Sequence, residues 1–211
     1  MELKGRTAIV SGSSSLTGIG AETAQHLAAK GCNVVINYVS NEAGADQTAA
    51  ACALHGVETR TGKADCSSDD DCRRMVQSAV DRWGRLDILV NNAAILRDGF
   101  IFKSDPADFD AVLKTNLAGA WYLTNAATPL MRQHAKDNRG GEPYQWGRVV
   151  NITSTAGLYG NFGQSSYASA KSGMLGLMRT TAMDLARAGI TCNAVAPFAA
   201  TRVTDTIVPA N

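Results

Sequence analysis

Tyr167 and Lys171 are the side chains of this sequence whose types and spacing most directly suggest proton-transfer chemistry. They are four residues apart in a helical pattern that begins at about Gln164, so we expect both on one helix face, one turn apart. An ammonium group about 4 to 5 Å from a partly buried phenol supplies roughly 3 to 4 kcal/mol in favour of phenolate, enough to move a pKa of ~10 towards ~7. Such a tyrosine can exchange a proton with an alcohol or carbonyl oxygen.

Ser154 is expected to assist the same chemistry. The apolar run 148–152 predicts a buried strand, and Ser154 follows where that strand ends. Its hydroxyl can donate a hydrogen bond to the oxygen with which Tyr167 exchanges a proton. A Tyr-x-x-x-Lys pair alone is more often an exposed ring beside a solvated lysine, so the interpretation depends on the motifs that accompany it.

A glycine-rich turn near the N-terminus supplies such a motif. The apolar strand 7–10 leads into it and a helical pattern over 20–30 follows, an order typical of dinucleotide-binding proteins. Glycine lets the backbone approach a pyrophosphate, and free N–H groups at the helix start attract the phosphates. The predicted phosphate-binding residues are Gly12, Ser14, Gly18, Ile19 and Gly20. The alternative is a flexible serine-rich loop without a ligand.

Strand and helix patterns alternate along the rest of the chain. Further strands are expected at 33–38, 57–64, 86–90, 148–152 and 191–196, and further helices at 41–54, 68–83, 106–133 and from 164. This alternation predicts an α/β fold, a doubly wound parallel sheet with helices on both faces and right-handed crossovers. We expect a single domain over 1–211, with a polar surface loop at 136–143.

The combined motifs resemble those of the short-chain dehydrogenase/reductase family, over residues 3–211. The motifs are the turn 11–20, Ala64-Asp65, Asn91-Asn-Ala-Ala94, Thr115-Asn116, Ser154, Tyr167 and Lys171. The resemblance implies a single Rossmann-type domain that binds NAD(P) and transfers hydride between nicotinamide and a secondary alcohol or ketone. Family members usually continue for a further helix and strand, so we expect the C-terminal closing segment to be absent.

The same resemblance implies roles for further residues. Asn116 would be a fourth catalytic residue, kinking a long helix and holding a water in a proton relay; alone, it would be interpreted as an exposed helical asparagine. Asp65 would bind the adenine, although an acid at a helix start is nearly as plausible. The remaining cofactor-binding residues would be Asn92, Ala93, Tyr167, Lys171, Pro197 and Thr201.

Tyr38, at the end of the second strand, is implied to lie beside the adenosine ribose. NAD-specific members have an aspartate there, which would repel a 2′-phosphate. Its absence favours NADP(H) over NAD(H), although the arginine often found in the glycine turn of NADP-dependent members is also missing.

Three segments, 91–98, 157–164 and 196–204, are most similar to the (3R)-hydroxyacyl-CoA dehydrogenase module of multifunctional enzyme type 2 and to 3-oxoacyl-acyl-carrier-protein reductases. This likeness implies a 3-hydroxyacyl or 3-oxoacyl thioester substrate and a place in fatty acid metabolism. Two alternatives stay open. One is a related enzyme acting on another alcohol or carbonyl, such as a sugar, steroid or xenobiotic, and the other is a non-catalytic dinucleotide-binding regulator.

Composition limits the classes of binding partner and the cellular location that we expect for this protein. The formal net charge is +1 without a basic stripe, which argues against nucleic acid. No signal peptide and no apolar run of ~20 residues is evident, so no membrane association is expected. Five cysteines without a CxxC pair argue against a metal site or disulfides and favour a reducing, cytoplasmic location. By resemblance, we expect a homo-oligomer, either a dimer or a tetramer.

Overall fold

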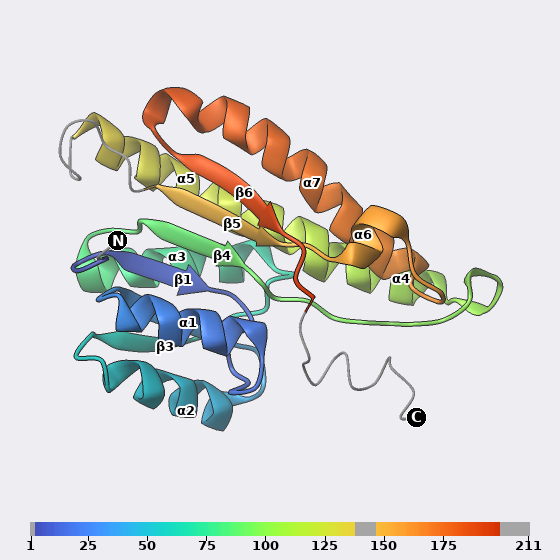
Figure 1. Ribbon diagram of the computed structural model, residues 1–211, viewed down its shortest axis with the longest axis horizontal. Coiled ribbons are helices and arrows are strands. Elements are labelled where there is room, and N and C mark those ends of the chain that lie inside the picture. Colours follow the sequence, from blue (N-terminus) through green and yellow to red (C-terminus); the bar gives the residue numbers. More distant parts are fainter. Residues whose placement is uncertain (1–2, 138–146, 199–211) are drawn as a thin grey trace.

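The computed structural model describes residues 3–137 and 147–198, which form a six-stranded parallel sheet with helices on both faces (Figure 1). The strand order is β3-β2-β1-β4-β5-β6. The strands are β1 (Thr7–Val10), β2 (Asn33–Tyr38), β3 (Thr59–Lys63), β4 (Ile88–Asn91), β5 (Arg148–Ile152) and β6 (Thr191–Val195). The helices are α1 (Ile19–Ala29), α2 (Glu42–Ala53), α3 (Asp69–Trp83), α4 (Pro106–Leu113), α5 (Gly119–Lys136), α6 (Thr155–Tyr159) and α7 (Ser165–Leu185).

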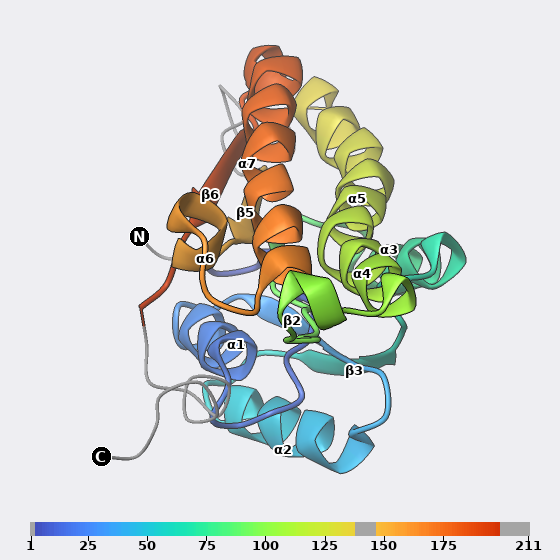
Figure 2. The same cartoon turned by 90° about the vertical axis from the view of Figure 1, so that its right-hand side faces the viewer.

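Helices α1 and α2 cover one face of the sheet, and α3, α5 and α7 cover the other (Figure 2). The strand order reverses between β1 and β4, so the chain turns away in opposite directions after these neighbouring strands. Such a reversal leaves a crevice at the carboxyl ends of the strands. The predicted α/β fold with a doubly wound parallel sheet is therefore confirmed.

Small side chains allow α1 to pack closely on the sheet. Its buried residues are Gly20, Ala21, Ala24 and Ala28. They face β1, whose four residues are all fully buried, as expected for a central strand covered on both faces. This close packing holds the start of α1 next to the end of β1, where the glycine-rich turn lies.

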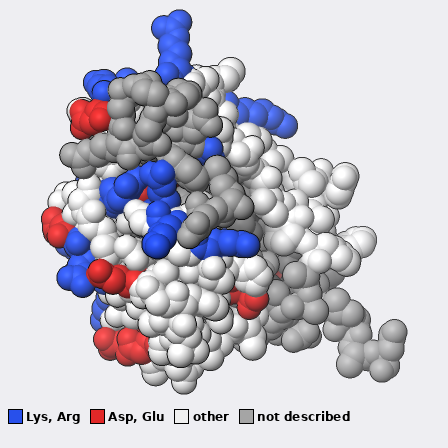
Figure 3. All heavy atoms as spheres, turned by 60° about the vertical axis from the view of Figure 1, so that its left-hand side comes forward, with Lys and Arg blue, Asp and Glu red and all other residues white. Residues whose placement is uncertain are grey.

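A buried carboxylate ties the strands together at the opposite, amino end of the sheet. Asp87 is fully buried, and its side chain accepts hydrogen bonds from the Thr7 backbone N–H at 2.9 Å and from the Arg85 guanidinium at 2.6 and 2.8 Å. Its backbone carbonyl accepts from the N–H of Arg148 at 2.8 Å. Figure 3 shows this end of the molecule, where Lys and Arg gather beside a few acidic side chains. Asp87 therefore fixes the starts of β1, β4 and β5 relative to one another.

The predicted helices and strands are all present, with differences at some of their ends, in α6 and in the long helix over 106–133. Helix α6 was not expected, and β3 and β4 each begin two residues later than predicted, at Thr59 and Ile88. The long helix predicted over 106–133 is divided into α4 and α5 by a π-helical turn, Lys114–Ala118. Most of the predicted loop 136–143 lies outside the described residues. Over residues 3–137 and 147–198, none of the helices is long and apolar enough to cross a bilayer.

Candidate active site

A cavity of about 1350 Å³ opens at the carboxyl ends of the strands, where the strand order reverses. Thirteen of the predicted site residues line it: Gly12, Ser14, Gly18, Ile19, Gly20, Tyr38, Asp65, Asn92, Ala93, Ser154, Tyr167, Lys171 and Pro197. Asn116 lies behind the wall, next to Thr115, which lines the cavity. Thr201 lies outside the described residues. The fold thus brings the glycine turn and the Tyr-Lys pair into one cavity.

Tyr167 lies in the first turn of α7, close to Ser154, which follows β5. Burial raises the pKa of the Tyr167 phenol, and a nearby carboxylate, Asp98, adds to the rise. A side-chain hydrogen bond with Ser154 opposes it. The lowered pKa expected from the spacing of Tyr167 and Lys171 is therefore not present in this arrangement, because burial outweighs the hydrogen bond with Ser154.

Lys171, one turn further along α7, is 1% exposed. Its Nζ donates a hydrogen bond to the carbonyl of Ile152 at 2.6 Å and lies 5.6 Å from the centre of the Tyr167 ring. Burial lowers the pKa of this ammonium to about 8. Lys171 thus contacts the end of β5 and lies beside the Tyr167 ring.

Asn116 occupies the π-helical turn between α4 and α5 and is 1% exposed. Its Oδ1 accepts from the N–H of Ile95 at 2.8 Å and its Nδ2 donates to the carbonyl of Ile95 at 2.9 Å. The amide side chain therefore holds the segment that follows β4. The interruption of the helix at Asn116 agrees with the predicted kink, and the alternative of an exposed asparagine is wrong.

The glycine turn fits the pyrophosphate of a dinucleotide. Gly12 has a positive φ of 61°, and a Cβ there would lie 2.8 Å from the Cα of Ala93. A Cβ on Gly20 would lie 2.6 Å from the carbonyl oxygen of Gly12. Gly18, the N-cap of α1, provides no capping side chain, so the first N–H groups of α1 lack intrahelical partners beside the cavity. This geometry favours an anionic ligand at the turn.

Three buried polar residues that the sequence analysis did not single out fix this turn from behind. Asn37, 1% exposed, accepts from the N–H of Gly12 at 2.8 Å through Oδ1 and donates to the carbonyl of Ala64 at 3.0 Å. Ser13 donates to the Val10 carbonyl at 2.7 Å and accepts from the Asn37 N–H at 3.0 Å. Ser11 accepts from the N–H groups of Asn92 and Ala93. The only sequence signal for Asn37 is a polar residue inside an otherwise apolar strand.

The cavity wall that is expected to face the adenosine ribose carries no charge. It consists of Tyr38, Val39, Ser40 and Asn41. The Tyr38 hydroxyl donates to a Glu42 carboxylate oxygen at 2.8 Å, so an acidic group lies next to this wall without lining the cavity. That hydrogen bond is the largest cause of a raised Tyr38 pKa.

Asp65 lines the cavity at the end of β3. Its Oδ1 also accepts a hydrogen bond from the N–H of Ser67 at 2.8 Å. Ser68, the N-cap of α3, follows directly. The position is thus compatible with a contact to adenine and also with the structural role of an acid before a helix.

A further pair joins two distant segments beside the part of the cavity that Gln164 and Tyr167 line. The Gln164 amide Nε2 donates to Asp98 Oδ2 at 2.9 Å, although these residues are 66 positions apart in the sequence. Gln164 lines the cavity and is 3% exposed. No spacing pattern in the sequence marks this pair.

Comparisons with known proteins agree with this geometry. The sequence profile of the family described as short chain dehydrogenase matches residues 6–210. A 3-oxoacyl-[acyl-carrier-protein] reductase of Synechocystis sp. is 38% identical over 206 residues, 97% of this chain and 78% of that protein. Peroxisomal multifunctional enzyme type 2 of Drosophila melanogaster is 37% identical over 210 residues, 97% of this chain and 33% of that protein. A short chain dehydrogenase structure from Mycobacterium avium has a TM-score of 0.85 and 32% identity, covering 93% of this chain and 68% of that one.

Proposed function

The chain belongs to the short-chain dehydrogenase family, and on that premise we propose that this oxidoreductase interconverts 3-oxoacyl and 3-hydroxyacyl thioesters with NADP(H), as part of fatty acid metabolism. The observation that carries the proposal is the meeting of Ser154, Tyr167 and Lys171 in the same cavity as the glycine turn. The likeness to a 3-oxoacyl reductase and to a multifunctional peroxisomal enzyme supports the thioester.

We assign the proton transfer to Tyr167. Ser154 donates a hydrogen bond to the substrate oxygen and so holds it beside the phenol. When bound, a nicotinamide cofactor would supply hydride to the carbonyl carbon. Tyr167 gives its phenolic proton to the substrate oxygen. Burial keeps the pKa of that phenol raised and hence the phenol protonated at neutral pH, which favours the reductive direction.

Lys171 is assigned to stabilise the phenolate that remains after proton transfer. Its ammonium lies 5.6 Å from the ring centre, within reach of an electrostatic interaction in this buried site. Asn116 is assigned a positioning role in the relay that returns a proton to Tyr167, because its amide fixes the backbone at Ile95, which lines the cavity.

The glycine turn and the residues at the strand ends are assigned to the cofactor. Gly12, Ser14, Gly18, Ile19 and Gly20 would hold the pyrophosphate through backbone contacts, which their close packing permits. Proposed contacts elsewhere on the cofactor come from Tyr38, Asp65, Asn92, Ala93, Tyr167, Lys171, Pro197 and Thr201. The uncharged wall from Tyr38 to Asn41 supports NADP(H), since Glu42 does not line the cavity.

The test is the initial rate with acetoacetyl-CoA, followed through the absorbance of the reduced cofactor, with NADPH and NADH in parallel. Turnover with a preference for NADPH is the expected result. A preference for NADH would retain the enzyme and contradict the cofactor assignment. Protein that binds cofactor but reduces no thioester would contradict the substrate, and a panel of sugar, steroid and xenobiotic carbonyls would then separate another dehydrogenase from a non-catalytic regulator.

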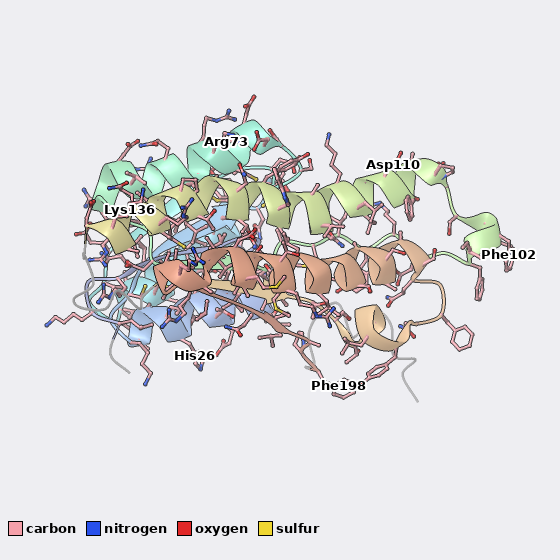
Figure 4. The ribbon with its side chains drawn as sticks, turned by 90° about the horizontal axis from the view of Figure 1, so that it is seen from above. His26, Arg73, Phe102, Asp110, Lys136 and Phe198 are labelled. Atoms are coloured by element: carbon pink, nitrogen blue, oxygen red, sulfur yellow. The ribbon has the colours of Figure 1, made fainter. Side chains whose placement is uncertain are left out.

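We also propose a cytoplasmic homo-oligomer, a dimer or tetramer. Helices α5 and α7 lie side by side along one face of the molecule (Figure 4), and they expose the large apolar side chains of Trp121 (49%) and Met183 (71%). Light scattering of the wild type and of the double variant W121E/M183E tests this. A particle mass of one chain for the wild type would contradict it.

A further inference from the structure

Asp98 and Gln164 connect the segment after β4 to the start of α7. Besides the hydrogen bond from Gln164 to Asp98, the N–H of Gly99 donates to the carbonyl of Gly163 at 2.8 Å. Gln164 Oε1 in turn accepts from the Asn161 amide at 3.0 Å. The amide nitrogen and the amide oxygen of the buried Gln164 side chain are thus both hydrogen-bonded. This fixed side chain positions the carboxylate of Asp98.

This connection places a negative charge near the reacting phenol. Gln164 directly precedes α7, and its carbonyl accepts from the N–H of Ala168 at 2.7 Å, so it lies one turn from Tyr167. Asp98 raises the pKa of Tyr167 and a hydrogen bond with Ser154 lowers it, while the Lys171 ammonium lies 5.6 Å from the ring centre. Of these three groups around Tyr167, Asp98 is the one that carries a negative charge.

The substrate end of the cavity has little positive charge to offset Asp98. Among the described residues that line the cavity, Asp65 and Lys171 are the charged ones. Asp65 lies at the end of β3, at the cofactor end, and Lys171 is buried and donates to the Ile152 carbonyl. Arg97, next to Asp98 in sequence, pairs with Asp108 at 3.3 Å. A second anion close to Tyr167 would therefore be disfavoured.

This charge distribution distinguishes two forms of one substrate. In a 3-oxoacyl thioester or ester, the carboxyl group next to the reacting ketone is esterified and uncharged. In the free 3-oxo acid, the same group is a carboxylate anion. With the ketone oxygen between Ser154 and Tyr167, the single methylene carbon between the ketone and carboxyl carbons keeps that carboxylate in the same part of the cavity. It would then lie near Asp98, and repulsion would weaken its binding.

We propose that Asp98, positioned by Gln164, selects uncharged 3-oxoacyl esters and thioesters over free 3-oxo acids. This inference rests on the proposed function and assigns a specificity-determining residue to the same site. Asp98 is exposed, so solvent screens its charge and the discrimination attributable to it is expected to be moderate, about 3- to 10-fold.

The experiment compares kcat/KM for ethyl acetoacetate with that for acetoacetate. The variant D98N keeps an oxygen that can accept from Gln164 and removes the charge, and D98A removes both. We expect D98N to lower the ester-to-acid preference about 3- to 10-fold, mainly through a lower KM for acetoacetate. The matched control is D110N, which removes an exposed carboxylate from neighbouring α4 and should leave the preference unchanged. An unchanged preference in D98N would overturn the inference.

A second measurement does not depend on turnover. The pKa of Tyr167 is obtained from the phenolate absorbance of each protein after subtraction of its Y167F counterpart. We expect this pKa to fall by about half a unit in D98N and to stay constant in D110N. No fall would contradict the placement of the charge, even in a protein without activity. A wild type that binds cofactor but reduces neither esters nor thioesters would instead contradict the proposed function.

Discussion

At the scale of single residues, Tyr167 is expected to account for the proton transfer. Replacing it with Phe removes the hydroxyl that hydrogen-bonds with Ser154 but keeps the ring, so the cavity wall is preserved. We predict a fall in kcat of about 10²- to 10⁴-fold with nearly unchanged affinity for NADPH. Steady-state kinetics and a cofactor fluorescence titration measure the two quantities. The control Y122F changes a ring on α5 and should keep the rate, while retained activity in Y167F would contradict the mechanism.

Lys171 gives the protein a predictable pH dependence of stability. Burial lowers its pKa from 10.5 to about 8, so between these values the unfolded chain binds a proton that the folded chain lacks. The free energy of unfolding should therefore rise with pH through this window, and below about pH 8 the full cost of burying the charge, about 3 kcal/mol, is present.

The variant K171M removes this cost. Loss of the hydrogen bond to the Ile152 carbonyl offsets part of the gain, so we predict a free energy of unfolding about 1 to 2 kcal/mol higher at pH 7 and a flatter profile from pH ~8 to ~10.5. Urea denaturation at several pH values measures both. The exposed Lys136→Met is the control. Equal pH slopes in K171M and the wild type would be inconsistent with this account.

At the scale of elements, helices α1 and α7 differ in whether a glycine can be replaced by a larger residue. An added Cβ at Gly20 would lie 2.5 Å from the Asn92 amide and 2.6 Å from the Gly12 carbonyl oxygen, whereas at Gly176 nothing lies within 4 Å. We predict that G20A lowers the free energy of unfolding by about 1 to 3 kcal/mol and weakens NADPH binding. G176A should stabilise α7 by about 0.5 to 1 kcal/mol. Urea denaturation and cofactor titration of both variants check this, and equal effects would contradict it.

Most elements could be predicted because each carries its own pattern. Strand β1 is a continuous apolar run, and α3 begins at a capping serine, Ser68, and ends at Gly84. Helix α6 could not be predicted, because its five residues contain a glycine and are followed by Gly160. The π-helical turn at Asn116 depends on the hydrogen bonds to Ile95, 21 residues earlier, which no local pattern encodes.

Over the whole molecule, Asp87 is the strongest link between the starts of the strands. It is fully buried, and D87A would leave the Arg85 guanidinium and the Thr7 N–H without this acceptor. We predict a loss of about 3 to 5 kcal/mol in the free energy of unfolding, measured by urea denaturation. The exposed Asp110→Ala should change it by less than about 0.5 kcal/mol. A loss in D87A no larger than in D110A would contradict this role.

The site was predictable where its residues share an element or a motif, and not where tertiary contacts create it. The family assignment was confirmed, and thirteen predicted residues line the cavity. Asn37 and the pair of Asp98 and Gln164 could not be identified, because their partners lie 25 or more residues away. The raised pKa of Tyr167 reflects burial, which spacing along one helix does not reveal.

The support of the glycine turn by Asn37 and Ser13 has a consequence for how this turn can evolve. Asn37 on β2 fixes the first part of the turn through hydrogen bonds with Gly12 and Ser13, and the packing of Gly20 fixes the last part. Substitutions and insertions at residues 15–17, between these two fixed parts of the turn, therefore leave the contacts of Asn37, Ser13 and Gly20 unchanged. Lineages descending from this protein should accumulate length and sequence changes in that interval while Asn37, Ser13 and Gly20 stay constant.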